Sequence, residues 1–155
     1  MSQQMRSYYE VIRDGIPCKL YFDIEYLKKY NKFVNGDEMM IIFKQFLIHY
    51  IFIQLKIKIS HIDIIDLTSS SNFKFSRHLV INLPNNYIFR DNYQCGIFVN
   101  KLCDTIQKKA KMGRYYDDDL KDMSDIDKKL RSLFISDHLH SFKKDYVLSV
   151  SYTHL

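Results

Sequence analysis

The chain has 155 residues, of which 46% are hydrophobic and 15% aromatic, and this composition excludes a disordered polypeptide. The formal net charge is +5, although residues 117–127 contain six Asp and only one Lys, so the rest of the chain is more basic still. A basic body favours polyanionic partners such as nucleic acid or nucleotides, but many ordinary domains carry a similar charge. The three Cys form no CxxC pair, which argues against a zinc quartet and favours a reducing compartment.

The first predicted element is a strand over residues 18–26, in which Leu20, Phe22 and Ile24 alternate with polar or charged residues. A long helix is predicted next, from Asp37 as its N-cap to about Ile53.

Residues 39–55 of this helix are apolar enough to suggest a membrane span as an alternative. Lys44 lies at the centre of that stretch, and a central Lys costs roughly 3 kcal/mol in a bilayer. We therefore expect a helix buried in a protein core, and no membrane among the partners of the chain.

A short strand is predicted near residues 61–67, followed by a serine-rich loop over 68–72. A second alternating strand covers 73–83 and stops at Pro84, because proline ends strands. A second helix is expected from Asp91 or Asn92 to Gly113. Its predicted apolar stripe consists of Ile97, Phe98, Leu102 and Ile106. The order strand, helix, strand, strand, helix predicts an α/β domain of the α+β kind.

Two acidic residues on the first strand are candidate metal ligands. Asp23 and Glu25 are separated by one residue, so both side chains point to the same face, about 6.6 Å apart along the strand. Paired carboxylates in this arrangement suit one or two divalent cations, as nucleotidyl transfer requires. The alternative is an ordinary solvated polar face.

Three residues of the later strand form a second candidate site. Lys74, Ser76 and His78 share one strand face and offer a cation, a hydroxyl and an imidazole, a set that suits the oxygens of a triphosphate. The alternative is a surface strand with incidental polar residues. Arg77 should face the other way, among Phe75 and Leu79, and pair with a buried acid. A His138-x-His140 pair lies in a poorly patterned tail and is interpreted as solvated.

Two stretches resemble a known family. YYEVIRDGIPCKLYFDIEY (residues 8–26) and SSSNFKFSRHLVINL (residues 69–83) are similar to the first and second catalytic motifs of the eukaryotic primase-polymerases, the PrimPol family of the archaeo-eukaryotic primase superfamily. The predicted helical segment GIFVNKLCDTI (residues 96–106), which follows the second motif, is also similar to that family. The resemblance covers roughly residues 7–112, and two collinear motifs of this length are more specific than either short pattern alone.

The resemblance implies a role for each candidate residue. It makes Asp23 and Glu25 catalytic metal ligands for Mn²⁺ or Mg²⁺, makes Ser76 and His78 ligands of the incoming nucleotide, and puts Lys74 beside its phosphates. It further implies an archaeo-eukaryotic primase core, with an RNA-recognition-like mixed sheet and packed helices.

The resemblance also implies a function. It implies that the chain belongs to a DNA-directed primase-polymerase, which makes and extends primers on single-stranded DNA from nucleoside triphosphates in replication and damage tolerance. The family implies a nuclear and mitochondrial location and a single-strand-binding protein as partner.

The sequence departs from the family in its last part. The family has a third catalytic aspartate on a later strand, but in YVLSVSYT (residues 146–153) its position falls on Val147, and Asp145 comes two residues early. We therefore expect an incomplete primase core that is inactive by itself, with 1–113 as the partial core, 114–131 as an acidic linker and 132–155 as an ambiguous tail.

The final VSYTHL is similar to translated sequencing-adapter text, so part of this tail is expected to be artefactual. The family's N-terminal template-gripping region and C-terminal zinc-binding segment have no counterpart in the sequence. Two alternatives to an enzyme stay open, namely a non-catalytic nucleotide- or DNA-binding module and a structural protein.

Overall fold

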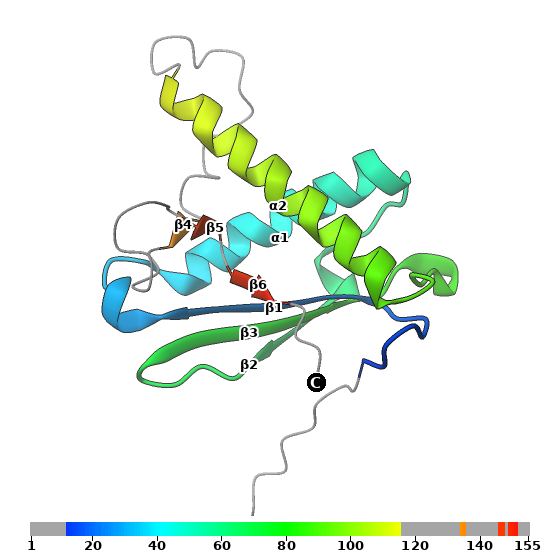
Figure 1. Cartoon of the computed structure of the whole chain (residues 1–155), viewed down its shortest axis with the longest axis horizontal. Helices are drawn as coiled ribbons and strands as arrows, with labels where there is room; N and C mark the ends of the chain where they lie inside the picture. Colours follow the sequence, from blue (N-terminus) through cyan, green and yellow to red (C-terminus); the bar gives the residue numbers. More distant parts are fainter. Residues whose placement is uncertain (1–11, 116–133, 136–145, 148, 152–155) are drawn as a thin grey trace, which may run out of the picture.

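The computed structural model describes residues 12–115, 134–135, 146–147 and 149–151, and the side chains of residues 12–109. Two long helices cover one face of an antiparallel sheet (Figure 1). The sheet order is β2-β3-β1-β6, with β1 (Leu20–Leu27), β2 (Ile64–Thr68), β3 (Lys74–Ile81) and β6 (Ser149–Ser151). The helices are α1 (Gly36–Leu55) and α2 (Asn92–Tyr115). The smaller elements are the 3₁₀ turns Lys28–Tyr30, His61–Asp63 and Pro84–Asn86, and a separate pair made of β4 (Phe134–Ile135) and β5 (Tyr146–Val147).

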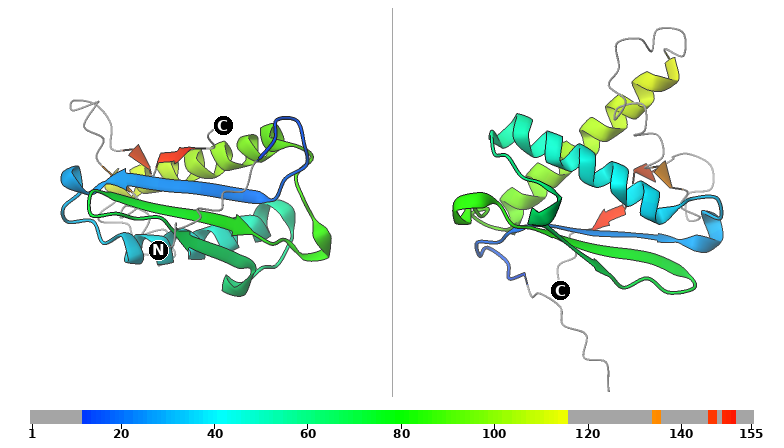
Figure 2. Two further views of the ribbon diagram at one scale, coloured as in Figure 1. Left: turned by 90° about the horizontal axis from the view of Figure 1, so that it is seen from below. Right: turned by 180° about the vertical axis from the view of Figure 1, so that it is seen from behind.

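The alternation in the sequence decides which side of the sheet the helices cover. Every second residue of β1 is buried against the helices, from Leu20 and Phe22 to Ile24 and Tyr26. Leu79 of β3 is paired with Phe22 and is also fully buried. The intervening residues face the other side of the sheet, which no described helix covers and onto which the left view of Figure 2 looks. We call this side the open face.

The α1 helix packs in the core as expected, although its N-cap differs from the prediction. Asn35 caps the helix, because its side chain accepts hydrogen bonds from the amides of Asp37 and Glu38 at 3.1 and 3.3 Å. Asp37, the predicted cap, lies in the first turn, where a carboxylate favours the positive end of the helix dipole. The buried residues of the helix are Gly36, Met39, Met40, Phe43, Phe46, Leu47, Tyr50 and Ile51.

By length and composition alone, α1 is the one helix among the described residues that could cross a membrane. Its central Lys44 is 2.8 Å from Asp66 of β2, and its apolar residues pack against the sheet. These contacts support the interpretation as a core helix, whereas the expectation that no membrane is a partner stays a prediction.

The α2 helix begins as predicted and runs past its predicted end. Asp91 caps it by accepting the amide of Gln94 at 2.7 Å. The helix continues through Gly113 to Tyr115. Ile97 is 57% exposed, so its place in the predicted stripe is wrong, and Cys95 and Val99 are buried beside Phe98, Leu102 and Ile106 instead. The stripe follows positions three and four apart, as helical geometry requires.

The α+β class is confirmed by these elements. A mixed sheet was expected, and every pairing between described strands is antiparallel. The sheet therefore offers one covered face and one face on which polar side chains can stand.

Candidate functional site

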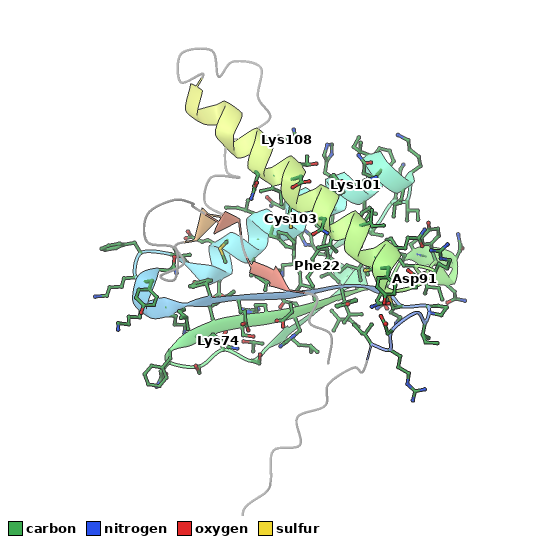
Figure 3. The ribbon with its side chains drawn as sticks, in the orientation of Figure 1. Phe22, Lys74, Asp91, Lys101, Cys103 and Lys108 are labelled. Atoms are coloured by element: carbon green, nitrogen blue, oxygen red, sulfur yellow. The ribbon has the colours of Figure 1, made fainter. Side chains whose placement is uncertain are left out.

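The pairing of β1 with β3 brings the two candidate sites together. In this antiparallel register His78 is opposite Asp23, Ser76 is opposite Glu25, and Lys74 is opposite Leu27. Directly opposed residues point to the same face of a sheet, with Cβ atoms about 4.5–5.5 Å apart. All five predicted residues therefore stand on the open face. In Figure 3, Lys74 lies on that side of the sheet, and Phe22 lies between the sheet and the helices.

Two contacts join the acidic strand to the basic one. The ammonium of Lys74 is 2.7 Å from a carboxylate oxygen of Glu25, and Nδ1 of His78 is 3.4 Å from Oδ1 of Asp23. These side chains are neither fully buried nor free in solvent: Asp23 is 23% exposed, His78 33% and Lys74 43%. Ser76 is 1% exposed. The site thus combines opposite charges on a partly desolvated surface, where charge-assisted hydrogen bonds are stronger than in water.

Asp23 has a polar side-chain atom whose hydrogen-bonding capacity the described residues leave unused. Its Oδ1 is buried and has no hydrogen bond. Burial raises the pKa of Asp23, His78 lowers it, Glu25 raises it and Lys74 lowers it, and the net direction is upward. A buried carboxylate oxygen without a donor is costly, and a bound cation would satisfy it.

The residues present fit a divalent cation, though the described part of the chain supplies only two acidic ligands. Asp23 and Glu25 offer hard oxygen atoms on one face, as Mg²⁺ and Mn²⁺ prefer. No group of three or more His, Cys, Asp or Glu residues that could hold a metal occurs among the residues that the structure describes. Further ligands would have to come from water, from the substrate or from residues outside the described ranges.

The strand β6 lies beside β1, which carries the two carboxylates. It pairs with β1 so that Ser151 is opposite Asp23 and Ser149 is opposite Glu25. Val147, which holds the expected aspartate position, belongs to β5 and pairs with Phe134 of β4. Asp145 and the His138-x-His140 pair lie outside the described residues.

A serine of the loop between β2 and β3 belongs to the site and was missed from the sequence. Oγ of Ser69 is 2.8 Å from Oγ of Ser76 and 3.0 Å from Nε2 of His78. The sequence places Ser69 in a serine-rich loop, which is an ordinary turn composition. The available signal was its position next to an alternating strand that carries Ser76 and His78.

Arg77 faces the helices, as its position between Ser76 and His78 predicted. Its guanidinium donates to Asp66 of β2 at 3.1 Å and to Asp37 of α1. Asp66 also accepts from Lys44, and these two cations outweigh the effect of burial, so the pKa of Asp66 is lowered. Arg77 and its acids tie β3 to β2 and α1 directly behind the candidate site.

The chain is similar to curated proteins that are named DNA-directed primase/polymerase protein. It is 39% identical to the one from Danio rerio over 94 residues, 38% to that of Mus musculus and 35% to that of Homo sapiens over the same length. Each match covers 61% of this chain and 17–18% of the relative, so the chain spans under a fifth of these proteins. No model of a known protein family matches the chain. The resemblance that the two motifs indicated is confirmed by these relatives.

Proposed function

Because the chain contains a segment of the primase/polymerase type, we propose that its open face binds a divalent cation and a nucleoside triphosphate for DNA-directed nucleotidyl transfer. The observation that carries this proposal is the register of β1 and β3, which aligns two carboxylates with a serine, a histidine and a lysine on one face. The positive and negative groups lie side by side, as a metal–triphosphate complex requires.

Asp23 and Glu25 would hold Mn²⁺ or Mg²⁺, and the cation would neutralise charge on the phosphates when bound. Lys74 attracts phosphate oxygens through its ammonium, and the hydroxyl of Ser76 and the imidazole of His78 can donate hydrogen bonds to them. The contacts of Lys74 with Glu25 and of His78 with Asp23 keep these donors close to where a metal-bound phosphate would lie.

The resemblance to the primase-polymerase family supports several finer proposals. We infer primer synthesis and extension on a single-stranded DNA template, a role in damage tolerance, a nuclear and mitochondrial location, and a single-strand-binding protein as partner. Their support is the likeness of the two motifs and the names of the relatives.

A non-catalytic nucleotide- or DNA-binding module is a second candidate, and one observation favours it. The strand next to Asp23 and Glu25 carries serines at the register positions opposite them, and β6 contains no acidic residue. Such a module would still bind a metal–nucleotide complex on the open face but would transfer no nucleotide.

Calorimetric titration with a deoxynucleoside triphosphate and Mg²⁺ tests the proposal. The wild-type chain should bind, and a Lys74→Ala, His78→Ala double variant should lose at least tenfold in affinity, because two charge-assisted contacts are removed. Lys58→Ala is the matched control, because this substitution also removes one lysine charge. Lys58 lies over the ring of Phe52 and contacts none of the site residues named above. Equal binding by the wild type and the double variant would contradict the phosphate role.

A further inference from the structure

Ser69 joins the two residues to which we assign nucleotide binding. Its hydroxyl lies within hydrogen-bond distance of both Oγ of Ser76 and Nε2 of His78, at 2.8 and 3.0 Å. On the other side of the imidazole, Nδ1 of His78 faces Asp23. The imidazole therefore has a polar neighbour at each ring nitrogen.

The hairpin between β2 and β3 fixes the backbone of Ser69. Its amide donates to the carbonyl of Ser76 at 3.1 Å, which extends the antiparallel pairing of the two strands by one position. Ser69 then stands opposite Ser76 on the open face, and diagonal to His78.

The next residue, Ser70, closes the hairpin through its side chain. Its hydroxyl accepts the amide of Ser76 at 2.9 Å and donates to the carbonyl of Ser76 at 3.1 Å. The backbone of the loop is thus tied to β3 through Ser70, and the hydroxyl of Ser69 is left to bond the two side chains.

We propose that Ser69 is a positioning residue that holds the imidazole of His78 and the hydroxyl of Ser76 in the orientation in which they receive a triphosphate. For its ligand this inference rests on the proposed function. A serine hydroxyl both donates and accepts, so Ser69 can bond Nε2 of His78 and Oγ of Ser76 at the same time. When Nε2 donates to Ser69 and Ser69 donates to Ser76, the hydroxyl hydrogen of Ser76 stays available to a phosphate oxygen. This chain of bonds fixes the rotation of the ring, and it reduces the rotamer freedom that binding would otherwise remove.

The contact with His78 can be observed without any nucleotide. In the full chain labelled with ¹⁵N-histidine, at a fixed pH, the signals of His78 are identified among the six histidines by their loss in His78→Gln. Ser69→Ala should shift the Nε2 signal of His78 towards that of a nitrogen without a hydrogen bond, and Ser69→Thr should restore it. Ser71→Ala is the control, because its hydroxyl accepts from the turn amides of Phe73 and Lys74. An Nε2 signal that does not move in Ser69→Ala would overturn the inference.

The consequence for the ligand is measured by titration of the same variants with a deoxynucleoside triphosphate and Mg²⁺. Ser69→Ala should weaken binding about two- to tenfold, the effect of losing one hydrogen bond, while Ser69→Thr and Ser71→Ala stay near the wild type. Tighter binding by Ser69→Ala would mean that Ser69 competes with the ligand, and would overturn a positioning role. A wild-type chain that binds no nucleotide would overturn the proposed function instead, and the ring-nitrogen signal would still decide the contact between Ser69 and His78.

Discussion

Gly36 opens α1 directly against the ring of Phe75, and Gly36→Ala tests how tightly the strand that carries the site is packed. A Cβ added at Gly36 would lie 2.5 Å from Cδ2 and 2.9 Å from Cζ of Phe75, and closer still to Cε2. Real Cβ atoms essentially never come this close to another heavy atom, so either the ring or the helix must move.

The ring of Phe75 has little room to move. It stacks on Tyr26 with ring centroids 4.9 Å apart, and the guanidinium of Arg77 lies 5.6 Å from its centroid. Overpacking of a core commonly costs about 1–3 kcal/mol. Alanine returns up to about 1 kcal/mol of helix propensity relative to glycine. The net expectation is a loss of up to about 3 kcal/mol, centred on about 1.5 kcal/mol, and the central value lowers Tm by about 3–6 °C for a chain of this size.

Thermal unfolding followed by circular dichroism measures this loss, and a double-mutant cycle assigns its cause. In a Phe75→Leu background the smaller side chain leaves space for the added methyl group, so Gly36→Ala should cost clearly less there. A Tm that is unchanged or raised by Gly36→Ala, or a cost that is the same in both backgrounds, would refute the packing argument.

Two further predictions concern the charges of the site and of the core behind it, and a third concerns activity. Asp23→Asn should raise Tm at pH 7 in metal-free buffer by about 2–4 °C, because it removes a buried carboxylate that Glu25 repels, and thermal unfolding checks it. Asp66→Asn should destabilise the chain by roughly 1.5–3 kcal/mol at pH 7, since Lys44 and Arg77 lose their shared acid. Because the pKa of Asp66 is lowered on folding, its contribution is present above pH 3.8 and is lost as the pH falls through the folded value, so the two unfolding curves should converge below pH 3.8. The 155-residue chain should make no detectable primers on a single-stranded template with Mn²⁺, because Val147 stands where the family has its third catalytic aspartate. Losing one such ligand or donor commonly costs about 10²–10³ in rate, and primer synthesis on a polypyrimidine strand measures this loss.

The strands that carry the candidate site could be predicted because their pattern has one simple cause. Leu20, Phe22 and Ile24 alternate with polar residues, and period two in a half-buried strand assigns each side chain to a face. The same rule put Asp23 and Glu25 on one face of the sheet, and it put Arg77 on the other face from its neighbours Ser76 and His78. Alternation does not tell which strand pairs with which, so the register between β1 and β3 required the structure.

Other features escaped prediction because they depend on contacts distant in the sequence or on choices between equivalent residues. Asn35 and Asp37 are both good N-caps, and only the backbone decides between them. The acids that pair with Arg77 come from β2 and α1, and no local pattern singles them out. Ser69 became part of the site through the hairpin pairing, which its loop composition does not encode.

Paramagnetic broadening by Mn²⁺ tests the central claim most directly, because it reports where on the chain the metal binds. Mn²⁺ added at substoichiometric amounts with a deoxynucleoside triphosphate should broaden the amide signals of Asp23–Glu25 and Ser76–His78 first, and an Asp23→Asn, Glu25→Gln variant should lose this effect. The acidic residues 117–127 are an internal competitor for the metal. Broadening confined to that segment, or broadening of the open face that persists in the double variant, would contradict the assignment of Asp23 and Glu25 as the metal ligands.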